Sequence, residues 1–289
     1  MAVKSILVPM EGSALDRYAL ELALVLARPS AAHIEGLYAK RDPKEALAYV
    51  GMGMGGEMTA IGPIMDQIEQ EGRAASKRSR RTFDDWAATT GLHDGSKAVT
   101  SGRVSVEWRE DNGTPEQVVT RAGARADLVV CPTLQREPGI EQEFVEAALF
   151  GAARPVVLAP YKLPSNPFRS AVIAWNGSHE ANRTVAAALA LLPRFDTVHL
   201  FCEAEGHRPQ QDSEQVLQLL VRHGIQAQRL EPHKPTGDLG HDLLQTAAAV
   251  EASMLIMGAY THGRTRQMVF GGVTHHVLHH TKLPTFLVH

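Results

Sequence analysis

The segment 257–274 combines the residue types that phosphate-binding loops use. Its glycines lie towards both ends, at Gly258, Gly263, Gly271 and Gly272. A glycine lets the backbone approach a ligand closely, and the start of a helix presents free N–H groups and a positive dipole end to an anion. Arg264 and Arg266 could add charge-assisted hydrogen bonds to phosphate. The residues therefore predict an anion or phosphate site, with a surface loop whose glycines only cap elements as the alternative.

Four histidines form a second group that could do chemistry. They lie on one predicted helix, and each pair four residues apart shares a face: His275, His276, His279 and His280. A zinc site usually needs a third or fourth ligand, and Cys202 and His262 qualify only if the fold brings them close. We therefore favour histidines that pack, cap the helix end or face solvent, and we do not expect zinc.

Signatures of catalysis are missing from the sequence. There is no Walker lysine, no G-x-S-x-G elbow and no evident carboxylate pair. The run GMGMGG at 51–56 fits G-x-G-x-x-G, but no convincing strand precedes it, so we interpret it as a loop before a helix. We predict no catalytic residue. Slow nucleotide hydrolysis through His262 and Arg264 is kept as an alternative.

The helix predicted at 63–90 carries a run of basic side chains. They are Arg73, Lys77, Arg78, Arg80 and Arg81. A solvated helical face is our interpretation, with an anion or partner site as the alternative.

The elements that must position these residues occur twice along the chain. SILVPMEGS at 5–13 is matched by SAVIAWNGS at 170–178, and ADLVVCP at 126–132 is matched by ASMLIMG at 252–258. Short apolar runs typical of strands buried on both faces alternate with segments of helical period. This predicts an α/β fold of two tandem doubly wound domains. The proline-rich run 160–167 separates the repeats, so we place domains at 1–160 and 168–289, with a linker at 161–167.

Composition narrows the compartment and the partners. The chain has 289 residues and a formal net charge of −3, so no overall field attracts nucleic acid or an anionic membrane. Neither a signal-peptide core nor an apolar run of membrane-spanning length is present. Cys131 and Cys202 lie in apolar runs, which favours buried thiols over a disulfide. We expect a cytoplasmic protein that binds neither nucleic acid nor membrane.

The repeated opening, the Met-Gly segment at 257–258 and the closing LPTFLV at 283–288 resemble the universal stress proteins. The resemblance covers nearly the whole chain, as two such units in tandem. It implies a five-stranded parallel sheet of order 3-2-1-4-5 in each domain. It also implies an adenine nucleotide, ATP, ADP or AMP, as a ligand.

Members of that family that bind ATP carry G-x-x-G, nine residues, then G-[ST]. The pattern falls here on Gly258, Thr261 and Gly271-Gly272, with Thr261 at the second glycine and Gly272 in place of Ser or Thr. Asn176 stands at the family's acidic position; it can contact ribose but is a poorer Mg²⁺ ligand than a carboxylate. The predicted nucleotide-binding set is Ala174, Trp175, Asn176, Phe201, Cys202, Met257, Gly258, Thr261, Gly263, Arg264, Gly271, Gly272 and Val273. By the same resemblance, Phe201 and Cys202 flank the adenine, Val273 supports the loop end, and we assign Arg264 to a phosphate.

The first repeat departs further from the pattern. Pro132 stands where Gly258 stands in the second repeat, and Glu11 adds negative charge near any phosphate. We predict that the first domain binds no nucleotide in this way and pairs with the second domain, as two subunits would.

The resulting hypothesis is a stress-response protein whose second domain binds an adenine nucleotide in a sensing role, not as a fast enzyme. One alternative is an interaction scaffold with a vestigial site that forms oligomers, such as a homodimer, through its last strands. The other is a weak nucleotide hydrolase.

Overall fold

Strands and helices alternate along the chain. The computed structural model describes residues 2–42, 61–92, 102–134, 140–202, 209–232, 235–259 and 272–289. The first half contains β1 (Ser5–Met10), α1 (Asp16–Ala27), a 3₁₀ turn (Arg28–Ser30), β2 (His33–Lys40), α3 (Ile61–Thr90), β3 (Ser105–Asn112), α4 (Pro115–Gly123), β4 (Leu128–Pro132), α5 (Ile140–Glu146), a π-helical turn (Ala147–Gly151) and β5 (Val156–Ala159). The second half contains β6 (Ser170–Trp175), α6 (His179–Ala188), a 3₁₀ turn (Leu192–Arg194), β7 (Thr197–Cys202), α7 (Pro209–Arg222), β8 (Ala227–Leu230), α8 (Leu239–Ala249), β9 (Met254–Gly258), α9 (Gly272–His280) and β10 (Thr285–Val288).

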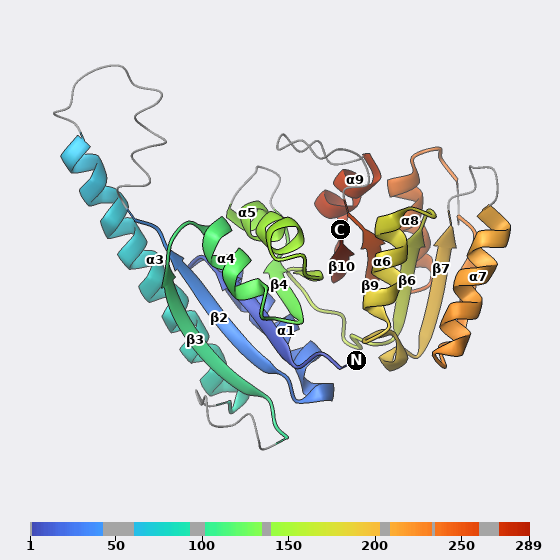
Figure 1. The fold of residues 1–289 in the computed structure, drawn as a ribbon, viewed down its shortest axis with the longest axis horizontal. Coiled ribbons are helices and arrows are strands. Elements are labelled where there is room, and N and C mark those ends of the chain that lie inside the picture. The colour runs from blue at the N-terminus through green and yellow to red at the C-terminus, as the bar shows by residue number, and fades with distance from the viewer. Residues whose placement is uncertain are drawn as a thin grey trace.

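These strands form one ten-stranded sheet in the order β3-β2-β1-β4-β5-β10-β9-β6-β7-β8 (Figure 1). Each half therefore has the order 3-2-1-4-5, as the resemblance implies. Pairing within each half is parallel, and β5 pairs with β10 antiparallel, Phe286 opposite Val157. The expected α/β class and doubly wound strand order are confirmed.

Helices cover both faces of the sheet and enclose two apolar layers. Side chains of α1, α3, α6 and α7 pack on one face, and those of α4, α5, α8 and α9 pack on the other. Successive strand residues alternate between the layers: Ile6 and Val8 face the first, and Leu7 faces the second. This two-sided burial explains why the central strands are continuous apolar runs.

Two elements depart from a simple apolar or helical pattern. β3 continues to Asn112, because its polar end pairs with β2 along the full register from His33–Ser105 to Lys40–Asn112. β3 is an edge strand, so polar side chains are tolerated there and the apolar pattern stops early. In the segment 140–151, α5 is followed directly by a π-helical turn.

Residues 161–167 form neither helix nor strand, and the division into domains at this segment stays a prediction. The glycine run at 51–56 lies outside the described residues. Among the described helices, none combines the length and apolar character needed to cross a bilayer.

Candidate functional site

The predicted site lies at the carboxyl edge of the second half, where β6 is flanked by β7 and β9. The register places Ala174 beside Phe201 on one side and beside Met257 on the other. The strand order reverses between β6 and β9, which is where open α/β sheets bind ligands. Three predicted residues from separate strands are therefore brought together.

The turn after β6 carries the exposed polar groups of this edge. Gly177 has a φ of +78°, a conformation that favours glycine. The Asn176 side-chain oxygen accepts the N–H of Ser178 at 3.1 Å, and the Ser178 hydroxyl accepts the N–H of Ala181 at 3.1 Å, which caps α6. One side of the Asn176 amide is thus used to shape the turn. Its N–H₂ group has no partner among the described residues and is exposed to solvent.

Gly258 ends β9 against the first turn of α6. A Cβ at this position would lie 3.0 Å from the Ala181 nitrogen and 3.0 Å from the Glu180 carbonyl carbon. The glycine therefore lets β9 and α6 approach each other, a packing role that the ligand-based interpretation did not include. Gly272, at the start of α9, is exposed and has open space around it.

Four predicted contact residues have buried side chains. Trp175, Phe201, Cys202 and Met257 are between 2% and 6% exposed. The Trp175 indole N–H donates to the Asn182 side-chain oxygen at 2.9 Å. Burial raises the pKa of the Cys202 thiol, and Arg229 and Ser213 oppose that shift. Val273 is partly buried in the first turn of α9, whereas Thr261, Gly263, Arg264 and Gly271 lie outside the described residues.

Comparison with known proteins bears on this half most directly. Residues 167–289 match the model of the Universal stress protein family. The C-terminal half of the chain belongs to the universal stress protein family. No curated protein sequence matches the chain.

Solved structures extend the likeness to both halves. A universal stress protein from Archaeoglobus fulgidus DSM 4304 aligns with a TM-score of 0.64 and 14% identity, covering 99% of this chain and 96% of that chain. A functionally unknown protein from Pseudomonas aeruginosa PAO1 aligns with a TM-score of 0.53 and 14% identity, covering 99% of this chain and 92% of that one. At these identities the likeness shows the fold, so the chain carries the universal stress protein fold in both halves.

The histidines of α9 in this universal stress protein domain lie against one another and against α8. The His275 and His279 rings are 4.4 Å apart, as are those of His276 and His280. His276 Nδ1 lies 3.5 Å from an Asp238 carboxylate oxygen. Across the described residues, no three metal-ligating side chains converge. His262 lies outside them.

In the first half, a side chain already occupies the backbone N–H groups of the corresponding turn. Asp16, fully buried at the start of α1, accepts the N–H groups of Glu11 at 3.0 Å and Gly12 at 2.8 Å. Burial raises the pKa of Asp16 to about 7, against the lowering effect of these two bonds. Gly12 has a φ of +83°, and a Cβ there would lie 2.3 Å from the Ala75 carbonyl oxygen of α3. The loop that follows the first strand is thus held between α1 and α3.

Sequence reasoning missed Asp16, although a signal was present. Asp16 lies three and four residues before Ala19 and Leu20, which are both fully buried. Residues at that spacing share a helix face, so a carboxylate there must be buried and must find donors.

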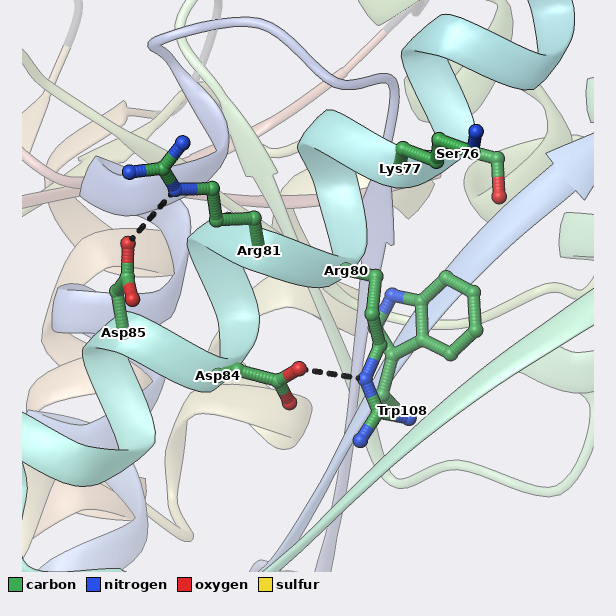
Figure 2. Close-up of a pocket in the computed structure, with 7 residues that line it drawn as sticks. All are labelled: Ser76, Lys77, Arg80, Arg81, Asp84, Asp85 and Trp108. Carbon is green, nitrogen blue, oxygen red and sulfur yellow. Dashed lines mark hydrogen bonds and ion pairs between the residues drawn. The ribbon is translucent and has the colours of Figure 1, made fainter.

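The arginine-rich helix α3 bounds a surface pocket of about 460 Å³ against β3 (Figure 2). Arg80 stacks over the Trp108 ring at 5.2 Å and its Nε lies 2.8 Å from Asp84, while Arg81 lies 3.5 Å from Asp85. Arg73 pairs with Glu69 in the same i,i+4 manner. These pairs along one helix favour a solvated, charge-balanced face over an anion site at this pocket.

Proposed function

We propose that the C-terminal universal stress protein domain binds an adenine nucleotide at the carboxyl ends of β6 and β9 and serves a stress-response role by sensing that nucleotide. The observation that carries the proposal is the turn 176–178. It exposes the N–H₂ group of the Asn176 amide at the start of a capped helix, where the strand order reverses. Such a helix start favours a negatively charged group, and the amide can donate to a ribose or phosphate oxygen.

The remaining phosphate contacts are assigned to the segment between β9 and α9. Thr261, Gly263, Arg264 and Gly271 belong to it, and Gly272 opens α9 with exposed space around its Cα. Arg264 is proposed to supply charge-assisted bonds to phosphate. Because Asn176 offers an amide and no carboxylate at the β6 turn, we propose that binding does not require Mg²⁺.

Buried Phe201 and Cys202 restrict how an adenine would be held. With both side chains 2% exposed, the base would contact the backbone edge of β7 or require these side chains to move. This observation favours the second candidate function, an interaction scaffold with a vestigial site. The first half would then serve as a structural partner, joined to the second half through β5 and β10.

Calorimetric titration of the full chain with ATP, ADP and AMP, with and without Mg²⁺, decides between the two candidates. We expect one saturable nucleotide site per chain that Arg264→Ala weakens roughly tenfold or more. Arg222→Ala is the matched control. Arg222 is the last residue of α7, which precedes the amino end of β8, and the proposed site lies at the carboxyl edge of the sheet. Absence of saturable heat with all three nucleotides would leave the scaffold as the better account.

A further inference from the structure

A cavity of about 510 Å³ lies at the carboxyl ends of β1 and β2 in the first half, between α3 and α5. Small-molecule sites are usually concave, mostly apolar and of about 300–1,000 Å³. The walls here are of that kind: Met10, Ala39 and Phe144 are buried, and Ile68 and Ile140 are partly buried around them. An apolar body of modest size would fit this cavity.

The polar side of the cavity carries four cationic side chains, one more than its three carboxylates, which are Glu11, Glu69 and Glu71. Lys40, Arg41 and Arg73 line it, and their partners are Glu110 at 3.4 Å, Glu143 at 3.0 Å and Glu69 at 2.5 Å. These pairs are exposed, and such pairs contribute little, so an incoming anion can compete for the cations at small cost. Glu71, another acidic residue of the wall, accepts a hydrogen bond from Gln67 at 2.9 Å.

Arg78 differs from the other cations of the wall. Its Nε donates to the Gly12 carbonyl at 3.0 Å, which fixes the direction of the guanidinium. In the described part of the chain it faces no carboxylate at ion-pair distance, so its terminal nitrogens remain available. A planar, oriented guanidinium is suited to bidentate binding of a carboxylate or a similar anion. Burial raises the pKa of Glu11, which also lines the cavity, and thereby favours the uncharged form that repels an anion less.

A polyphosphate fits this cavity poorly. Asp16 already accepts the N–H groups of Glu11 and Gly12, which a phosphate would otherwise bind. At the end of β4, Pro132 has no N–H to donate, and residues 131–134 are all buried. The cavity therefore offers a guanidinium and apolar walls, without a cradle of backbone N–H groups.

We propose that the first half binds a small organic anion with an apolar body, such as a medium-chain carboxylate, whose charged group meets Arg78 and whose chain lies against the partly buried Ile68 and Ile140. This site is separate from the proposed nucleotide site and does not depend on it.

The test is calorimetric titration of the full chain with decanoate and with decanol, its uncharged analogue. We expect saturable decanoate binding at one site per chain, weakened roughly tenfold by Arg78→Ala. Decanol should bind wild type and Arg78→Ala equally, because only the carboxylate uses the guanidinium. Arg81→Ala is the matched control on the same helix and should change the affinity for neither decanoate nor decanol.

A second variant tests the location of the site without removing a charge. Gly72 lines the cavity and has nothing within 4 Å of its Cβ position, so Gly72→Leu should fill the cavity without disturbing the fold. Gly62→Leu is its control. Gly62 also lies in α3 and has open space at its Cβ position, but it does not line the cavity. We expect Gly72→Leu to abolish decanoate binding and Gly62→Leu to preserve it. Lack of saturable decanoate binding, equal effects of the paired variants, or a cavity that takes AMP and not decanoate would overturn the proposal.

Discussion

The turn after the first strand contains a glycine of positive φ in both halves but leads into its helix differently and exposes different groups. Gly12 and Gly177 occupy corresponding positions at φ values of +83° and +78°. In the first half Asp16 accepts the backbone N–H groups of this turn, whereas its counterpart in the second half is Ala181, which has no acceptor side chain. The glycine conformation is shared, but the first-half turn is bound by a buried carboxylate that the second-half turn lacks.

The ends of the fourth strands differ in a parallel way. β4 ends in Pro132, followed by buried residues, whereas β9 ends in Gly258 and is followed by the segment assigned to phosphate binding. Gly258 also lets α6 approach β9 closely. The first half thus ends β4 at Pro132, which has no N–H to donate, and has a cavity at the carboxyl ends of β1 and β2, whereas the second half has a glycine where we propose nucleotide binding.

The largest expected effect concerns Asp16 and the pH dependence of stability. Its pKa is raised from 3.8 to about 7 in the folded state, so the unfolded chain releases this proton first as the pH rises. Its stabilising contribution is therefore fully present below about pH 3.8 and is lost as the pH approaches 7. At about 1.4 kcal/mol per pKa unit, the free energy of unfolding falls by a few kcal/mol across this pH range because of Asp16. Asp16→Asn should remove this component from urea unfolding curves measured between these pH values.

The control for Asp16→Asn is Asp85→Asn, an exposed carboxylate paired with Arg81. Asparagine can accept only one of the two N–H groups, so the absolute stability of Asp16→Asn is not the informative quantity. The informative quantity is the change with pH relative to wild type. Identical pH profiles for wild type and Asp16→Asn would mean that Asp16 does not close the first-half turn as a buried acid.

A smaller effect separates the packing role of Gly258 from a ligand role. Gly258→Ala places a methyl group 3.0 Å from backbone atoms of α6, and overpacking of this kind costs about 1–3 kcal/mol of unfolding free energy. Gly272→Ala meets open space and should be neutral or stabilise α9 by up to about 1 kcal/mol. Urea unfolding measures both. Loss of nucleotide binding by Gly258→Ala without loss of stability would instead favour direct contact with a ligand.

The fold could be predicted from the sequence because burial on both faces leaves a plain pattern. Apolar runs such as Leu128 to Val130 indicate a central parallel strand, and the similarity of SILVPMEGS and SAVIAWNGS indicates a duplicated unit. The polar end of β3 could not be found in this way, because an edge strand is held by its neighbour's backbone and its side chains face water.

Less of the candidate site could be predicted, because residue types do not reveal which groups are already engaged. Spacing placed Ala174, Phe201 and Met257 on adjacent strands, and the register confirms that they are neighbours. Spacing could not show that Gly258 packs on α6 or that Asp16 occupies the first-half turn, since both facts depend on contacts between distant segments. The predicted roles of Thr261, Gly263, Arg264 and Gly271 stay predictions.

A third prediction concerns the metal dependence of the second half. Asn176→Asp keeps the oxygen that accepts the Ser178 N–H and replaces the free amide N–H₂ with a second carboxylate oxygen. The new charge should weaken ATP binding roughly tenfold without Mg²⁺, through repulsion and loss of a donor, and should make binding respond to Mg²⁺. Glu11→Gln, the change at the corresponding first-half position, should leave ATP affinity unchanged. Titrations with and without Mg²⁺ measure both, and a metal-independent Asn176→Asp variant would place the phosphates away from this turn.

The smallest effect tests whether the arginines of α3 form a structural face, as the pocket against β3 indicates (Figure 2). Arg80 combines an ion pair to Asp84 with a stack on Trp108, so Arg80→Ala should cost about 0.5–1 kcal/mol of unfolding free energy. Arg81 forms only an ion pair to Asp85, with 85% of its side chain exposed, so Arg81→Ala should stay within about 0.5 kcal/mol of wild type. Raising the salt concentration should shrink the Arg80→Ala effect only in part, because stacking on a ring depends less on screening than an exposed pair does. Equal costs for the two variants would mean that the Trp108 contact adds nothing to the stability of the fold.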